Sequence, residues 1–239
     1  MKPLNIKNYD AIGHFPNSKL GEGDHHISAG HIRIFTQQKR DHWDTIWVHE
    51  KYDGSNVGII KHQNQILALT RSGLLAKNSR FLQHRLFAHW VAQRERLFAE
   101  ILAEGERLVG EWMAQAHGIR YKISTEPIVF FDYFSPENER YLQQDFLAKV
   151  KPHGLNTPRK LHEGDAIPPE DLIPILNQKT PEIESVEMPE GMVYRVERCG
   201  KVDTLAKWVR SDFKNGQYIK NVAEADFVWN VPPATLTER

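Results

Sequence analysis

The stretch HEKYDGSNVGII, residues His49 to Ile60, places Glu, Lys and Asp side by side between two apolar runs with the composition of β-strands. Two interpretations fit it. Lys51 is a solvated residue of an ordinary hairpin, since Asp-Gly is a favoured turn pair, or it is a reactive lysine held at the end of a strand. The rest of the chain bears on this choice.

Composition limits what that lysine can belong to. The chain has 239 residues, 40% of them hydrophobic, so it can bury a sizeable core. It lacks repeats and long linkers, and we expect one domain over residues 1–239. Its 31 basic and 31 acidic residues leave no net charge, so any site for a polyanion must be local. The single cysteine, Cys199, excludes a disulfide framework and a zinc cluster.

The sequence also bears on location. The N-terminus MKPLNIKNYD lacks the apolar core of a signal peptide. Nowhere does an apolar run approach the ~18 residues that a membrane-spanning helix needs. We therefore expect a cytoplasmic protein without a membrane partner, which suits a chain with one cysteine.

Short runs of strand composition recur along the chain, mostly without a helix between neighbours. They cover residues 45–50, 56–60, 66–70, 107–112, 127–134, 191–197 and 202–209, with a further short strand expected at 31–35. The first three suggest a meander. Apolar spacing predicts helices at residues 78–103, 137–150 and 169–177, the first capped by Asn78 or Ser79. The predicted fold class is α+β, with mainly antiparallel sheets flanked by helices.

Charged side chains interrupt or end several of these apolar strands. They are Lys51, Arg71, Glu111, Asp132, Glu190 and Lys207. Burying an isolated charge is costly, so charges placed in this way usually meet one another or a charged ligand. Taken singly, each is more often a turn or strand-end residue. Their order along the chain is the informative feature.

That order resembles the covalent nucleotidyltransferases, the superfamily of ATP-dependent DNA ligases, RNA ligases and mRNA capping enzymes. The matching segments are KYDGSN, TRSG, VGEW, VFFD, EGMVYR and LAKWVRSDF, which together span about residues 47–213. Asn56, five residues after Lys51, is closest to the RNA ligases typified by the second RNA ligase of phage T4. In one departure, Val209 stands where that family often has a second lysine, with Arg210 following it.

The resemblance implies a nucleotidyltransferase domain, ATP-grasp-like in fold, and a role for each matching residue. Lys51 attacks the α-phosphorus of ATP to form lysyl-AMP, with Lys207 and Glu190 as the other catalytic residues. Glu190, and less directly Asp53, would hold Mg²⁺ or Mn²⁺. The implied nucleotide-binding residues are Glu50, Lys51, Asn56, Arg71, Glu111, Phe131, Glu190 and Lys207.

Attack requires a neutral amine, whereas an ordinary lysine has a pKa near ~10.4. Neighbouring cations and partial desolvation lower such a pKa. Lys207, Arg71 and a bound metal ion are the candidates for the positive charge. The same charges would stabilise the α-phosphate and the departing pyrophosphate.

The substrate implied by the resemblance is RNA with a 5′-phosphate and a 3′-hydroxyl end, sealed during RNA repair by a monomer, with a repair partner protein as a further candidate. The Gly- and His-rich segment before the catalytic strands could recognise the ends. Our candidates are His25, His26 and Arg33, together with Arg210. Basic residues of the first predicted helix, among them Arg80, are more often ordinary surface charges.

Other classes remain open. A minimal DNA ligase and a capping-type guanylyltransferase share the same motifs, but both usually carry a trailing oligonucleotide-binding fold, and 26 residues follow Phe213 here, too few for one. A non-catalytic nucleic-acid-binding protein on the same scaffold is the third alternative. It is disfavoured because the lysines and glutamates of the motifs are all present.

Overall fold

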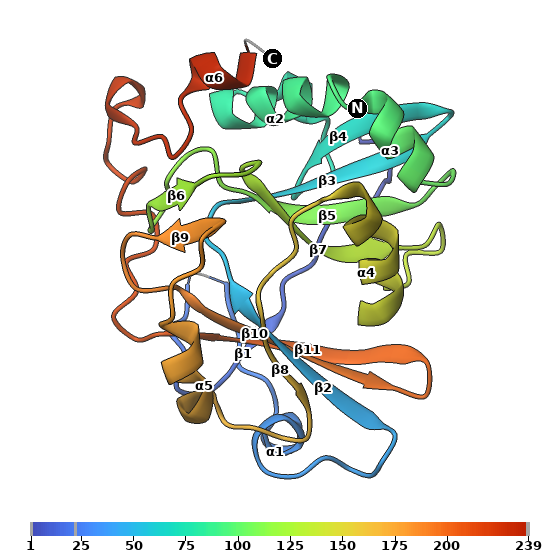
Figure 1. The fold of residues 1–239 in the computed structure, drawn as a ribbon, viewed down its shortest axis with the longest axis vertical. Coiled ribbons are helices and arrows are strands. Elements are labelled where there is room, and N and C mark those ends of the chain that lie inside the picture. The colour runs from blue at the N-terminus through green and yellow to red at the C-terminus, as the bar shows by residue number, and fades with distance from the viewer. Residues whose placement is uncertain (1, 22, 238–239) are drawn as a thin grey trace.

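Two sheets form the framework of the chain, one above the other in Figure 1. The computed structural model describes residues 2–21 and 23–237. The upper sheet has the order β4-β3-β5-β7, the lower one β1-β11-β10-β2-β8, and β6 pairs with β9. The strands are β1 (Gly13–His14), β2 (Asp44–Lys51), β3 (Ser55–His62), β4 (Gln65–Thr70), β5 (Arg107–Trp112), β6 (Tyr121–Ile123), β7 (Ile128–Phe134), β8 (Lys160–Gly164), β9 (Ile183–Ser185), β10 (Gly191–Arg198) and β11 (Lys201–Val209).

Helices cover the outer sides of both sheets, with α2 and α3 above the upper sheet and α1 and α5 beside the lower one (Figure 1). The helices are α1 (Ala29–Thr36), α2 (Leu82–Ala92), α3 (Glu95–Ile101), α4 (Gln143–Val150), α5 (Pro169–Leu176) and α6 (Pro233–Thr237), with 3₁₀ turns at Ala76–Asn78, Lys151–His153 and Glu224–Asp226. All paired strands except the short parallel pair β1–β11 run antiparallel. The predicted α+β class is confirmed.

Each sheet has its own hydrophobic core. Trp90 of α2 packs on Trp112 of β5 beneath the helices of the upper layer. In the lower layer, Phe35 of α1 packs on Tyr194 of β10. Both cores combine fully buried aromatic rings with aliphatic side chains, and burying this apolar surface stabilises each layer.

The meander predicted from the first three strands is wrong. β2 pairs with β10 and β8 in the lower sheet, whereas β3 pairs with β4 and β5 in the upper one. The KYDGS stretch is therefore no hairpin, because it carries the chain from one sheet to the other. A Cβ on Gly54 would lie 2.5 Å from the carbonyl oxygen of Trp112, so only glycine fits this close crossing.

Three helix and strand predictions also need correction. Residues 31–35, predicted as a strand, lie in α1, because Ser28 caps that helix by accepting a hydrogen bond from the backbone of His31 at 3.3 Å. The long helix predicted at 78–103 is divided into α2 and α3, and α2 begins only at Leu82 because Ser79 has an extended backbone after the 3₁₀ turn. The helix predicted at 137–150 begins only at Gln143, after a turn with Asn138 at positive φ.

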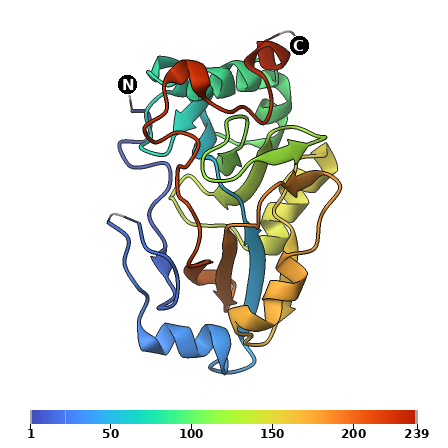
Figure 2. The ribbon, with the colours of Figure 1, turned by 90° about the vertical axis from the view of Figure 1, so that its left-hand side faces the viewer.

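The two ends of the chain pack against this framework. Residues 13–19 lie along β11, and Phe15 N donates to the carbonyl of Lys207. Residues 214–231 turn back over the loop 113–118, and Figure 2 shows this segment in red running up the near side of the molecule. Within the described ranges, no helix is both long and apolar enough to cross a membrane.

Candidate active site

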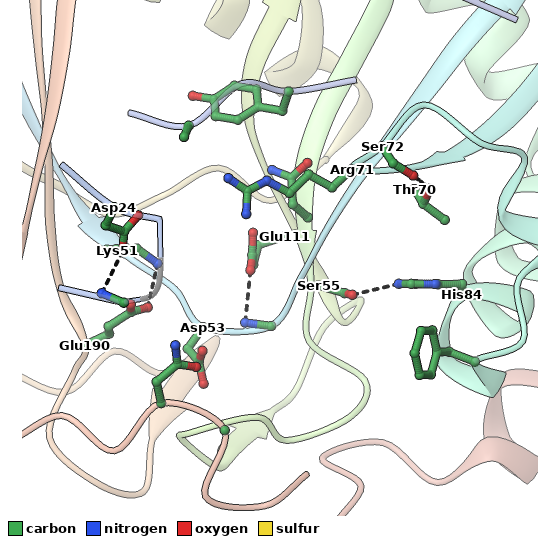
Figure 3. Close-up of a pocket in the computed structure, with 18 of the residues that line it drawn as sticks. Asp24, Lys51, Asp53, Ser55, Thr70, Arg71, Ser72, His84, Glu111 and Glu190 are labelled. Carbon is green, nitrogen blue, oxygen red and sulfur yellow. Dashed lines mark hydrogen bonds and ion pairs between the residues drawn. The ribbon is translucent and has the colours of Figure 1, made fainter. Parts of the chain in front are cut away.

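A cleft of about 1760 Å³ opens where β2 crosses to β3, and the charged residues of the motifs meet there. Figure 3 shows Lys51, Glu190 and Asp24 on one side of it, with Glu111 and Arg71 beside them. Eight cationic side chains line it (Lys7, Lys19, Lys51, Arg71, Arg80, Lys207, Lys214 and Lys220) against four carboxylates (Asp24, Asp53, Glu111 and Glu190). In a chain without net charge, this local excess favours a polyanionic ligand.

Lys51 forms an ion pair with Glu190, whose Oε2 lies 2.6 Å from its Nζ. Lys51 ends β2, Glu190 immediately precedes β10, and the two strands are hydrogen-bonded neighbours. Burial lowers the pKa of Lys51, but Glu190, Glu111 and Asp53 outweigh that effect, so its pKa lies above the ordinary value. The depressed pKa expected from the sequence is therefore not found in the free protein, where Lys51 is a charged ammonium.

Glu190 is buried and Glu111 is half-buried, and in both the cost of desolvating the carboxylate exceeds the stabilisation from nearby cations. Desolvation raises the pKa of Glu111 to about 8, although Lys51 opposes the rise. Desolvation likewise raises the pKa of Glu190 to about 7, again against Lys51. Both carboxyl groups line the cleft, where an added cation would stabilise their charged forms. The electrostatics of the site therefore favour a ligand that brings a cation with it.

This donor set fits Mg²⁺ or Mn²⁺ bound together with phosphates. Mg²⁺ commonly binds through one or two carboxylates, substrate phosphates and water. No group of three or more metal-binding side chains occurs within residues 2–21 and 23–237. Glu190 is the better placed carboxylate, because Asp53 Oδ2 already accepts from the backbone of Gly118 at 2.5 Å and Ile119 at 3.0 Å, which leaves Oδ1.

A smaller pocket of about 180 Å³ adjoins the cleft and also reaches Lys51, Glu111 and Lys207. Its apolar walls include Tyr9, Phe131 and Val193. The ladder between β5 and β7 pairs Val109 with Asp132 and Gly110 with Phe130, so Phe131 is the extra residue of a β-bulge. Bulges redirect side chains next to binding sites, and this one leaves the Phe131 ring on the pocket wall with its edge contact to Tyr9 at 5.3 Å. The pocket can hold one planar ring.

The remaining nucleotide-binding candidates lie around these two cavities. Asn56 and Arg71 line both, and Arg71 is exposed. Glu111 Oε1 accepts from the backbone N–H of Gly54 at 3.0 Å. This bond fixes Glu111, the candidate for binding the ribose, to the segment that carries the chain from β2 to β3. Glu50 lines the small pocket, but its carboxylate is paired with Arg159 at 2.9 Å. This ion pair engages Oε2 of Glu50 and ties β2 to Arg159.

The end-recognition candidates lie outside both cavities. His25, His26 and Arg33 are exposed, and none of them lines either wall. Arg210 donates to the carbonyl of Pro189 at 2.9 Å, so its side chain fixes the backbone next to Glu190. Among the described residues between Gly21 and Arg33, Gly21 and Asp24 line the cleft.

Several lining residues were not identified from the sequence. His14 and Tyr9 come from the N-terminal segment, and Lys214 and Lys220 come from the C-terminal one. His49 is 9% exposed and lines the small pocket, where burial lowers its pKa to about 3. Only its position two residues before Lys51, on the same face of β2, could have indicated His49. Tyr9 and His14 lie far before the first motif, KYDGSN, whereas Lys214 directly follows the last one, LAKWVRSDF, and Lys220 comes soon after it.

The fold and the clustered motif residues define a nucleotidyltransferase domain of the ligase type. The family model for RNA ligase matches residues 44–209, and the chain belongs to the RNA ligase family. A search of curated proteins finds no match.

Solved structures agree on the fold. An archaeal ATP-dependent RNA ligase aligns with a TM-score of 0.56 and 17% identity over 85% of this chain and 48% of its own. A putative ATP-dependent DNA ligase from Aquifex aeolicus gives 0.56 and 16% over 85% and 50%. An RNA ligase from Naegleria gruberi, solved with pyrophosphate, gives 0.54 and 14% over 83% and 59%. The chain thus spans about half the length of these structures.

Proposed function

We propose that this chain is an ATP-dependent RNA ligase that works through a lysyl-AMP intermediate on Lys51. The observation that carries the proposal is the meeting of Lys51, Glu190, Glu111 and Lys207 at one cleft that opens directly onto a pocket for a planar ring. Membership of the RNA ligase family supports it.

In the first step, Lys51 Nζ forms a bond to the α-phosphorus of ATP, and the bond from that phosphorus to the bridging oxygen of the β-phosphate breaks. Pyrophosphate leaves with the electron pair. The Lys51 ammonium gives up a proton before attack, and Glu190 Oε2, at 2.6 Å, is the base already in contact with it. The cations of the cleft balance the charge that develops on the phosphates.

A divalent cation held by Glu190 would stabilise the phosphates, and its positive charge would lower the pKa of the Lys51 ammonium. Of the chain's own residues, Phe131 offers a flat face to the purine in the small pocket. Glu111 can accept hydrogen bonds from the ribose hydroxyls. Lys207 faces the same cleft as a second cation for the α-phosphate.

In the later steps, AMP passes from Lys51 to a 5′-phosphate end of RNA, which restores the free amine. A 3′-hydroxyl then attacks that activated phosphorus, seals the strand and releases AMP. The excess of cations around the cleft supports a nucleic-acid substrate. We place the reaction in RNA repair in the cytoplasm.

One experiment separates this function from its alternatives. The protein is incubated with Mg²⁺ and α-labelled ATP, GTP or adenylate-labelled NAD⁺, denatured, and separated on a gel. We expect a labelled band only with ATP. Transfer of the label to 5′-phosphorylated RNA and to matched DNA then tests the substrate, because a DNA ligase of the Aquifex aeolicus type shares the fold. A band with GTP only would favour a capping-type enzyme, and no band would favour a non-catalytic protein.

A further inference from the structure

Residues 13–19 and Asp24, which we call the N-terminal segment, pack against Lys207. The proposed function gives Lys207 no residue that positions it. The backbone of Phe15 donates to the carbonyl of Lys207 at 3.0 Å, and that of Lys19 donates to the carbonyl of Val209 at 3.0 Å. Residues 13–14 pair in parallel with residues 206–207 of β11. This segment lies outside the residues matched by the RNA ligase family model, which begin at 44.

Side chains of the segment form a connected chain that starts and ends on β11. The backbone N–H of Val209 donates to Ser18 Oγ at 2.8 Å, and Ser18 Oγ lies 2.7 Å from His14 Nδ1. His14 Nε2 is buried and lies 2.9 Å from Asp24 Oδ2, a close contact that lacks the geometry of a hydrogen bond. Asp24 Oδ1 lies 3.3 Å from Lys207 Nζ. We call His14, Ser18 and Asp24 the N-terminal brace.

The hydrogen positions follow from the chemistry of these groups. Burial lowers the pKa of His14 to about 4, with Lys207 adding to the effect, so the ring is neutral at pH 7. Burial alone would raise the pKa of Asp24, but the Gly21 N–H and Lys207 bring it below the ordinary value. A charged carboxylate only accepts, so Nε2 of His14 carries the proton toward Asp24 and Nδ1 accepts from the Ser18 hydroxyl. This tautomer suits both neighbours of the His14 ring, Ser18 on one side and Asp24 on the other.

Lys207 sits between opposing charges. Burial and the neighbouring Lys51 ammonium lower its pKa, whereas Asp24 and Glu190 raise it, with a net pKa below the ordinary value. Glu190 is already paired with Lys51. Asp24 is the carboxylate in direct contact with Lys207 within the part of the chain that the structure describes. Removing its charge would leave Lys207 facing Lys51 without a partner of its own.

We propose that Asp24, oriented by His14 and Ser18, is a positioning residue that keeps Lys207 charged and directed into the cleft for the α-phosphate. This inference rests on the proposed function. It gives the segment that precedes the catalytic strands a role in the adenylation step, distinct from the end recognition expected of its exposed residues. The brace holds both the direction of the Lys207 ammonium, through Asp24, and the backbone two residues further on, through Ser18.

The first test does not need ligase activity. Trace acetylation of lysine amines across pH, followed by mass spectrometry, measures the pKa of Lys207 in the wild type and in Asp24→Asn, which keeps the size of the side chain. We expect the pKa of Lys207 to fall in Asp24→Asn, and to stay at the wild-type value in Asp165→Asn, a control at a carboxylate that is 81% exposed and paired with Lys39. An unchanged Lys207 pKa in Asp24→Asn overturns the inference.

The second test uses the pH dependence of the single-turnover rate of AMP adduct formation. Because Lys207 must be charged, its deprotonation sets an alkaline limb, and that limb should move to lower pH in Asp24→Asn. We expect the rate above this limb to fall by at least about tenfold, with partial recovery in Asp24→Glu. A slower rate with no movement of the limb would assign Asp24 a merely structural role and contradict the proposal. Absence of any adduct in the wild type would instead refute the ligase function, while the labelling result would stand.

Discussion

The carboxyl group of Glu111 lines the cleft and should make the stability of the fold depend on pH. Glu111→Gln tests this most sharply. Desolvation raises the pKa of Glu111 from an ordinary 4.5 to about 8 in the folded chain. A carboxyl group with a raised folded-state pKa contributes fully to stability below its unfolded pKa. That contribution is lost as the pH rises from about 4.5 toward 8.

The size of the effect follows from the same values. A difference of about 3.5 between the two pKa values corresponds to at most ~5 kcal/mol, at ~1.36 kcal/mol for each pKa unit. Lys51 and Glu190 titrate together with Glu111, so we expect roughly half of this, about 2 kcal/mol. Glutamine keeps an oxygen for the Gly54 N–H and has no proton to lose. The variant should therefore match the wild type near pH 5 and exceed its unfolding free energy by about 2 kcal/mol near pH 9.

Urea denaturation followed by tryptophan fluorescence at both pH values measures this difference. Glu100→Gln is the matched control, because Glu100 is 55% exposed and pairs with Arg96 on the same helix. The variant should also bind ATP more weakly, since Glu111 faces the cleft. If the unfolding free energies of wild type and Glu111→Gln change with pH in parallel, desolvation does not raise the pKa of Glu111, and the electrostatic account of the site is wrong.

Three further predictions concern the reaction itself. Glu190→Ala should lower the rate of adduct formation at saturating ATP by at least about tenfold, equivalent to ~1.4 kcal/mol of barrier. A loss smaller than this at every Mg²⁺ concentration of a titration would show that Glu190 is neither the metal ligand nor the base. Phe131→Ala should raise the KM for ATP several-fold while Phe131→Tyr, which keeps the ring face, should not, and equal effects would place the ring in the core rather than against the base. Replacing His25, His26 and Arg33 together with alanine should spare adduct formation, since all three lie outside both cavities, but should depress AMP transfer to 5′-phosphorylated RNA. Equal loss of both steps would instead assign these residues to the ATP site, and no loss of either step would make them ordinary surface residues.

Strand composition and motif order carried most of the information that the sequence held about the site. Lys51, Glu111, Glu190 and Lys207 could be grouped beforehand because each charge lies in or beside an apolar strand and their order along the chain resembles that of the covalent nucleotidyltransferases. The pairing of the strands could not be predicted in the same way. Asp53-Gly54 has the local chemistry of a hairpin turn, and only the partners of β2 and β3 show that it crosses between sheets.

The N-terminal residues of the site were hidden for a different reason. His14 and Asp24 lie 193 and 183 positions from Lys207, and a sequence pattern carries no information about such distant contacts. The helix at 29–36 was misjudged because Ile32 and Ile34 alternate as in a strand, while the Ser28 cap that decides the structure is a single residue. The protonation of Lys51 depends on summed charges across several elements, which only the assembled site provides.

Mapping the AMP adduct to one residue tests the central claim most directly. After incubation with ATP and Mg²⁺, the protein is digested without acid, because a phosphoramidate is acid-labile, and the modified peptide is sequenced by mass spectrometry. The account predicts AMP on Lys51 in the wild type and no adduct in Lys51→Ala or in Lys51→Arg, whose guanidinium cannot be deprotonated to a nucleophile. An adduct on any other residue, or one that persists in either variant, would contradict it.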